Sequence, residues 1–227
     1  MARRYRWLRA QWPISMRTLA NRLKARPFGS DVSHGFVIDR VRDDLLEGRY
    51  VERVEYTETV TDPFGVELSF ERIEFRQSSF RATVFGAGLE VRDPPRSLQP
   101  LMNRLSEATD FEVVITPHIV DVLAWAAQFQ GSSGLSAVVD SLHMTALQVE
   151  KGITAKVVFK GDRDVREAST LLAGKRPFSL ERIQLRLPKP YFGTVILSSA
   201  AAATLNVDDP NDVLLENLRG DLVDALR

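Results

Sequence analysis

Residues 69–76, SFERIEFR, and residues 179–186, SLERIQLR, are two octapeptides with five identical residues and three conservative differences. Apolar and charged residues alternate in both, as in a β-strand that is buried on one face. Each octapeptide is followed by a second apolar stretch and, further on, by an Asp-Pro step into an amphipathic helical pattern. A hairpin with one helix buries little surface alone, whereas two copies could share a core. The sequence leaves open whether the similarity is a true duplication or a chance match.

The patterns around the octapeptides predict an α+β fold, with mixed or mainly antiparallel sheets that are formed by hairpins and packed by amphipathic helices. Period-two alternation and short apolar runs predict strands at 50–60, 66–76, 80–91, 111–117, 137–149, 153–160, 179–187 and 191–198. Apolar residues three and four positions apart predict helices at 16–23, 36–47, 98–105, 119–129 and 165–172, and a last helix that begins at Asp209-Pro210.

Glycine and serine in QGSSG, residues 130–134, indicate a flexible break in the chain. We expect three parts: a basic N-terminal arm and helix (1–29), a first α+β half (30–129) and a second α+β half (135–227), with this break between the two halves. The alternative is one continuous domain, because 227 residues are enough for a single large core.

The first thirty residues carry eight Lys or Arg and no acid, although the whole chain has 30 basic and 30 acidic residues. The rest of the chain therefore holds 22 basic and 30 acidic side chains, a net charge of −8. A basic segment on an acidic body is typical of proteins with an anionic partner. Met16 could also be the natural start, in which case residues 1–15 are an upstream extension.

Cysteine is absent, which excludes disulfides and thiolate metal sites and indicates a reducing compartment such as the cytoplasm. No apolar run has the length of a membrane span, so we do not expect membrane association. No catalytic motif or metal-ligand spacing can be recognised, and we expect neither a cofactor nor a metal. If the protein is an enzyme, its active site is dispersed along the sequence, and His118, Asp121 and Glu112 are the candidates.

Cations alternate with aromatic residues in RRYRWLR, residues 3–9, a pattern that suits nucleic acid because cations neutralise phosphates and rings stack on bases. The arginines of the two octapeptides would share one sheet face if the octapeptides paired. In the alternative interpretation, Trp7 packs on the acidic body and the arginines form ion pairs. The candidate nucleic-acid-binding residues are Arg3, Arg4, Arg6, Trp7, Arg9, Arg17, Arg22, Lys24, Arg72, Arg76, Arg182 and Arg186.

The C-terminal segment contains a leucine stripe, with Leu214, Leu218 and Leu222 at intervals of four residues. A lone helix of this length is marginal in water, so the stripe must be covered. The cover is either the chain's own sheet or the surface of a protein partner, which includes self-association.

These observations support three hypotheses for the function. The first is a non-enzymatic bacterial α+β interaction module, a subunit of a larger cytoplasmic assembly. The second is a nucleic-acid-binding protein that uses the basic N-terminal arm and the sheet arginines. The third is an enzyme with a dispersed active site.

Overall fold

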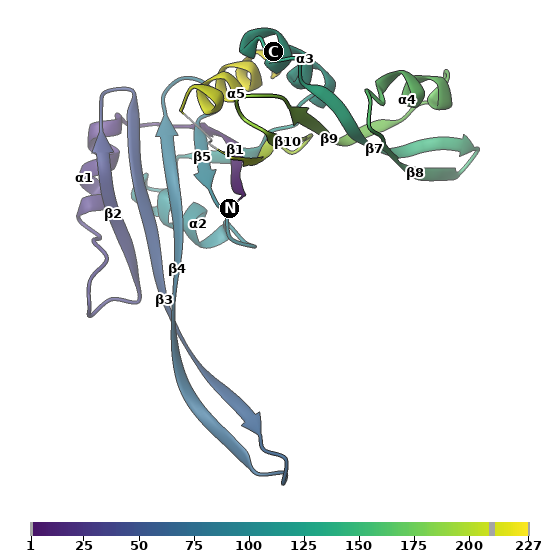
Figure 1. Cartoon of the computed structure of the whole chain (residues 1–227). Coiled ribbons are helices and arrows are strands. Elements are labelled where there is room, and N and C mark those ends of the chain that lie inside the picture. The colour runs from purple at the N-terminus through teal and green to yellow at the C-terminus, as the bar shows by residue number, and fades with distance from the viewer. Residues whose placement is uncertain (1, 209–211, 227) are drawn as a thin grey trace. The chain divides into compact units, whose positions relative to one another are not determined.

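The structure is a computed structural model that describes residues 2–208 and 212–226. It confirms an α+β fold, in which mainly antiparallel strands are packed by amphipathic helices (Figure 1). The chain folds into two compact units. Unit 1 consists of Met1–Ala10, Phe85–Glu90 and Ile115–Arg227, and unit 2 consists of Gln11–Val84 and Val91–Val114.

Unit 1 is built on an antiparallel sheet with the strand order β1-β11-β10-β9-β7-β8. The helices α3 and α5 pack against each other, and α3 also packs on β9 and β10, so that one face of the sheet is covered. The strands are β1 (Arg3–Gln11), β7 (Val138–Glu150), β8 (Ile153–Lys160), β9 (Ser179–Leu187), β10 (Gly193–Ser198) and β11 (Ala202–Val207). The helices are α3 (Val122–Ser133), α4 (Arg166–Ala173) and α5 (Asp212–Ala225).

The core of unit 1 lies between this covered face and the two helices. α3 is apolar on nearly every side, as expected for a central helix, and Trp125 on it is completely buried. The stripe of α5 points into the same core, where Leu214, Leu218 and Leu222 are buried. The chain's own sheet and helix therefore cover the stripe, and these leucines are not available to a partner. The expected helix start at Asp209-Pro210 lies outside the described residues.

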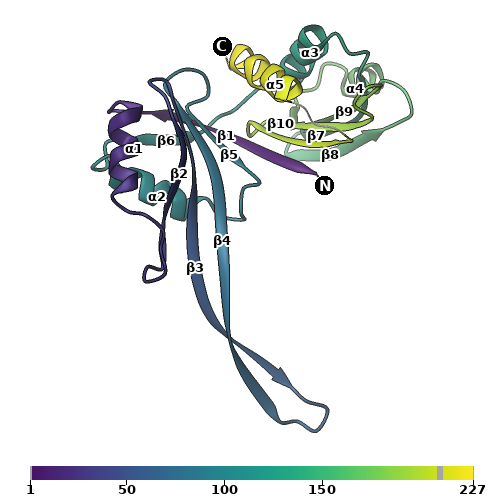
Figure 2. The ribbon, with the colours of Figure 1, turned by 60° about the vertical axis from the view of Figure 1, so that its left-hand side comes forward.

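Unit 2 contains a meander of three strands, in which β3 (Leu45–Thr61) pairs with β2 (His34–Val41) on one side and with β4 (Glu67–Thr83) on the other. The helix α1 (Met16–Lys24) packs on β2 and β3 and contacts α2 (Gln99–Ala108). Two short strands, β5 (Leu89–Arg92) and β6 (Val114–Pro117), occur where the chain passes between the two units. The strands β3 and β4 continue beyond β2 as a long hairpin (Figure 2).

The helix expected at 36–47 is wrong, because this segment forms β2, a tight turn and the start of β3. The amide of Arg42 donates to the carbonyl of Leu45 to close the turn, and Phe36 and Leu46 are buried. Gly48, expected to end the helix, lies in β3, where an added Cβ would come within 2.8 Å of the Val37 carbonyl oxygen. Glycine here allows close strand packing rather than helix termination.

The flexible break expected at 130–134 is also wrong. The helix α3 continues to Ser133, and Gly134 ends it with a left-handed φ of 63°, a common helix C-terminus. The hydroxyl of Ser132 donates to the Asp221 carboxylate on α5 at 2.7 Å, which ties this segment to the neighbouring helix.

The two octapeptides both lie in strands, as expected, but their environments differ. Ile183 on β9 is completely buried, whereas Ile73 on β4 is 55% exposed. If the octapeptides were equivalent strands buried on one face, both isoleucines would be buried, and this expectation is wrong for Ile73. The octapeptides also do not pair with each other, because β9 pairs with β7 and β10 whereas this part of β4 pairs with β3.

The difference in burial predicts different costs for the same substitution. Ile183→Ala should destabilise the protein by about 2–5 kcal/mol, because it leaves a cavity in the core of unit 1. Ile73→Ala, the matched control in the other octapeptide, should change the free energy of unfolding by less than about 0.5 kcal/mol. Urea denaturation of the two variants measures both values, and equal costs would contradict the assigned burial.

Candidate functional site

The basic N-terminal segment is not a free arm but the strand β1, which pairs with β11. Its aromatic residues face the core of unit 1, where Tyr5 and Trp7 are each 2% exposed. The Trp7 ring stacks on Tyr5 and meets Trp125 edge to face at 5.7 Å. Trp7 is therefore not accessible for base stacking in this structure, as the alternative interpretation of this segment expected.

A buried carboxylate holds β1 in this orientation. The indole Nε1 of Trp7 donates to Glu90 at 2.8 Å, and Arg219 on α5 donates to both oxygens of the same carboxylate at 2.6 Å. Burial alone would lower the pKa of Arg219, but the hydrogen bond and charge of Glu90 raise it above its usual value. The arginine therefore stays charged, and one side chain joins β1, β5 and α5.

With the aromatic residues inward, alternate residues of β1 face the opposite side of the sheet. Residues directly opposite each other in antiparallel strands share a face, so the printed register of six strands places residues in rows. The first row runs Arg6, Ala202, Ser198, Arg182, His143 and Val158. The second row runs Arg4, Thr204, Ile196, Gln184, Ser141 and Lys160.

The two rows and their neighbours on this face form a basic surface, which we call the basic sheet face. Arg186 lies two residues beyond Gln184, and Lys156 lies two residues before Val158, so both share the face. Its cations are Arg4, Arg6, Lys156, Lys160, Arg182 and Arg186, and α3 packs on the opposite face.

Two acids contact the basic sheet face and neutralise part of its charge. Glu181 pairs with Lys156 at 2.7 Å, and Asp140 lies 3.9 Å from Arg186. Within the described part of the chain, three further cations form no ion pair, namely Arg6, Arg182 and Lys160. The Nε of Arg6 is also buried without a hydrogen-bond acceptor. Arg6, Arg182 and Lys160 are therefore the cations of this face that an anionic partner could pair with.

The other predicted nucleic-acid-binding residues lie elsewhere. Arg17 and Arg22 on α1 pair with Asp43 and Asp110 at 2.5 and 2.6 Å, and Lys24 ends the same helix. Arg72 and Arg76 on β4 pair with Glu58 and Glu74 at 2.8 and 3.1 Å. Arg3 and Arg9 are exposed on β1, but neither belongs to the two rows. The structure therefore joins Arg4 and Arg6 with Arg182 and Arg186, and it leaves the first octapeptide out.

The sequence analysis missed the cations of β8. Lys156 and Lys160 occupy the outward positions of the alternating strand ITAKVVFK, and this alternation was visible in the sequence. Their place beside Arg182 depends on the pairing of β8 with β7 and of β7 with β9, which no local pattern encodes.

Two of the three residues suggested for a dispersed active site have structural partners. The Asp121 carboxylate caps α3 by accepting from the amides of Leu123 and Ala124. The Nε2 of His118 lies 3.0 Å from the carbonyl oxygen of Ala87. Glu112 belongs to unit 2, whereas the other two belong to unit 1.

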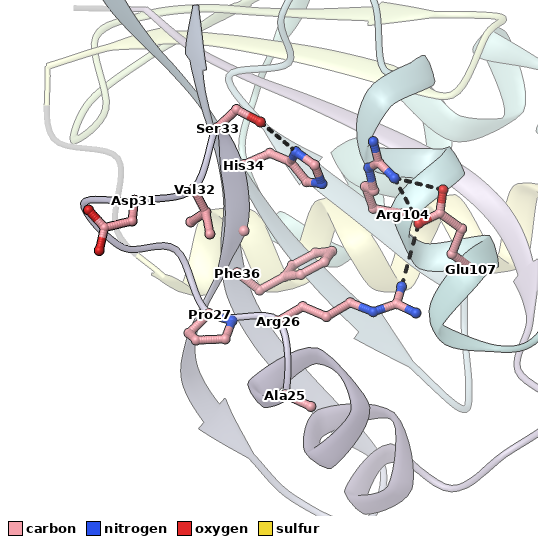
Figure 3. A pocket seen from close by; sticks show the side chains of 11 residues that line it. Ala25, Arg26, Pro27, Asp31, Val32, Ser33, His34, Phe36, Arg104 and Glu107 are labelled. Carbon is pink, nitrogen blue, oxygen red and sulfur yellow. Dashed lines mark hydrogen bonds and ion pairs between the residues drawn. The ribbon is translucent and has the colours of Figure 1, made fainter.

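Unit 2 contains a pocket of about 590 Å³ between the loop after α1 and α2 (Figure 3). Glu107 accepts from Arg104 at 2.8 Å and lies 3.5 Å from Arg26, so both arginines share its carboxylate. His34 Nδ1 lies 3.1 Å from the hydroxyl of the adjacent Ser33. The hydrogen bond from Arg104 lowers the pKa of Glu107 below its ordinary value of 4.5, although burial acts in the opposite direction. The charges of the pocket are paired with each other, which favours a structural role.

Comparison with known proteins assigns this chain to no family. No known protein family matches the sequence, and no curated protein is significantly similar to it. Across residues 2–208 and 212–226, no group of three or more potential ligands could hold a metal ion. In the same ranges, no helix is long and apolar enough to cross a membrane.

Because the buried Glu90 carboxylate orients β1, we expect its removal to lower the stability of the protein strongly. Glu90→Ala should destabilise the protein by about 3–5 kcal/mol, because it leaves the buried Arg219 charge without its main partner. The matched control is Glu216→Ala, which removes an exposed carboxylate 2.6 Å from the same arginine and should cost less than about 1 kcal/mol. Chemical denaturation compares the two, and similar losses would show that Glu90 does not hold β1.

The paired charges of the pocket predict a pH-dependent contribution to stability. The pKa of Glu107 is lower in the folded state than in the unfolded state. Its contribution to stability is therefore fully present above pH 4.5 and is lost as the pH falls through the pKa of the folded state. Glu107→Gln should therefore lower the free energy of unfolding at pH 7 by less than about 1 kcal/mol, since the pair is partly exposed. Thermal melts from pH 7 to pH 3 should show the two proteins converging, and a constant difference would contradict this assignment.

Proposed function

We propose that the protein is a non-enzymatic module that binds nucleic acid through the basic sheet face of unit 1. The observation that carries the proposal is the strand register, because it sets Arg6 in line with Arg182 and Arg4 in line with Lys160. These cations come from distant parts of the sequence, and three of the six have no ion pair among the described residues.

The chemistry of the face suits a phosphate backbone. Guanidinium groups donate two parallel hydrogen bonds to phosphate oxygens, and binding releases counterions from the nucleic acid. Neighbouring strands are about 4.8 Å apart, so a row across six strands spans about 24 Å. At about 3.4 Å per nucleotide, this length corresponds to about seven nucleotides of one strand.

The residues between the cations determine how the nucleic acid would be recognised. They are small or uncharged, such as Ser198, Thr204 and Gln184, and neither row contains Phe, Tyr or Trp. With the imidazole of His143 as the one ring in the two rows, the face would bind mainly the backbone and carry little sequence preference. The absence of cysteine fits a reducing compartment, so the proposal places this activity in the cytoplasm.

The salt dependence of binding tests the proposal. The double variant Arg6→Gln/Arg182→Gln should bind a labelled duplex DNA or single-stranded RNA about tenfold or more weakly at low salt. Its slope of log K against log salt should fall by about 1.4–1.8, corresponding to two lost phosphate contacts. Fluorescence anisotropy across a salt titration gives both values.

The first octapeptide supplies a control for this experiment. Arg72→Gln/Arg76→Gln removes the same number of charges from unit 2, where both arginines have carboxylate partners, and should leave the slope unchanged. The proposal fails if the wild-type protein binds neither probe at low salt. It also fails if the two double variants lose the same affinity.

A further inference from the structure

The β3–β4 hairpin extends beyond the rest of the unit 2 sheet. The strand β2 begins at His34, opposite Glu52, and residues 53–76 extend past it as a two-stranded ribbon (Figures 1 and 2). At the base of this ribbon, the amide of Arg53 donates to the carbonyl of Ser33, and the Phe75 ring meets Phe28 edge to face. We call residues 53–76 the distal hairpin. It contains nine directly opposed residue pairs, from Arg53–Phe75 to Thr61–Glu67, which at about 3.3 Å per residue reach about 30 Å. A two-stranded hairpin is marginally stable alone in water, so a segment of this length needs packing partners.

The two faces of the distal hairpin differ in chemistry. One face pairs Tyr56 with Arg72, Glu58 with Phe70, and Val60 with Leu68, and we call it the apolar face. Toward the tip, the other face pairs Thr57 with Glu71, Thr59 with Ser69, and Thr61 with Glu67, whereas at its base it carries Ile73 and Phe75. The contrast between the two faces therefore belongs to the half of the hairpin nearest the tip. This alternation is typical of a sheet that is covered on one side.

In this structure the apolar face is uncovered. Its large apolar side chains are each about half exposed, and they are Tyr56, Val60, Leu68 and Phe70. The tip beside them is well ordered by hydrogen bonds, because the Asp62 carboxylate accepts from the amides of Phe64 and Val66 at 2.8 Å. The Phe64 side chain at this tip is 91% exposed. A rigid tip and an apolar face are suited to docking rather than to solvent exposure.

The charges of the apolar face are balanced within the hairpin. Arg72 pairs with Glu58 at 2.8 Å, and Arg76 pairs with Glu74 at 3.1 Å. The two pairs balance the charge of this face, and the excess of acids in the hairpin lies on the other face and at Asp62 of the tip. Two copies of the apolar face can therefore meet without an unbalanced charge between them. A nucleic acid is disfavoured as the occupant, since the distal hairpin carries six acids and three arginines.

We propose that the occupant of the apolar face is the same face of a second copy of this chain. The contact is isologous, in which one self-complementary patch serves both subunits around a two-fold axis. Two ribbons packed face to face form a small sandwich about 10 Å thick, with Tyr56, Val60, Leu68 and Phe70 of both copies inside. The threonines and acids of the other face remain in water.

The mass of the full chain in solution tests this dimer. Sedimentation over about a hundredfold concentration range should show a species of twice 25.5 kDa that dissociates on dilution. Leu68→Asp should raise the dimer dissociation constant by about tenfold or more, because it buries an unpaired charge in the interface. The matched control is Ser69→Asp, the neighbouring residue on the opposite face, which should leave the dissociation constant unchanged.

A crosslinking experiment provides a measurement that does not depend on a destabilising charge. The chain has no cysteine, so Leu68→Cys and Ser69→Cys each introduce a single thiol. A short bismaleimide should join two chains covalently through Cys at position 68 and leave the position 69 variant uncrosslinked on a denaturing gel. A wild-type protein that stays monomeric at every concentration overturns the proposal, whatever else the hairpin binds. Equal effects at positions 68 and 69 overturn it as well.

Discussion

The Glu90 carboxylate is the interaction on which the arrangement of unit 1 depends. Removing a carboxylate from water costs several kcal/mol unless hydrogen bonds and an opposite charge replace the lost hydration. Here, Arg219 supplies two short hydrogen bonds and Trp7 supplies a third. Because the three residues belong to β5, α5 and β1, the carboxylate can be satisfied only when these segments are correctly aligned. The free energy of one buried charge thus determines which side of β1 faces the core.

That choice of side separates two chemistries that are mixed in the sequence. A strand turns alternate residues to opposite faces, so RRYRWLR contributes Tyr5 and Trp7 to the core and Arg4 and Arg6 to the open side. The aromatic residues that made the segment resemble a nucleic-acid-binding arm are therefore structural. The arginines become part of a larger basic surface through the sheet, because the register of β11, β10 and β9 aligns Arg6 with Arg182.

Local patterns predicted the strands and helices whose buried residues recur with the spacing of that element. They failed at residues 36–47, where the apolar residues fit the spacing of a helix as well as that of a strand. β8 and β9 follow a clear alternation, and α3 is apolar on nearly every side, so each was predictable from its own sequence. Residues 36–47 also satisfy a helical spacing, but pairing between β2 and β3 outweighs that propensity. The basic sheet face was not predictable, because it depends on strand order and on registers that join residue 6 to residue 182. No pattern within either segment contains that information.

The zero net charge of the chain conceals a division of charge between two surfaces. The basic sheet face of unit 1 gathers six cations, whereas the distal hairpin of unit 2 has twice as many acids as arginines. A phosphate backbone attracted to the first surface would be repelled by the second. The acids of the hairpin, which lie partly on its polar face, would therefore keep nucleic acid away from the apolar face. With charge assigned in this way, the hairpin repels the ligand proposed for the basic sheet face.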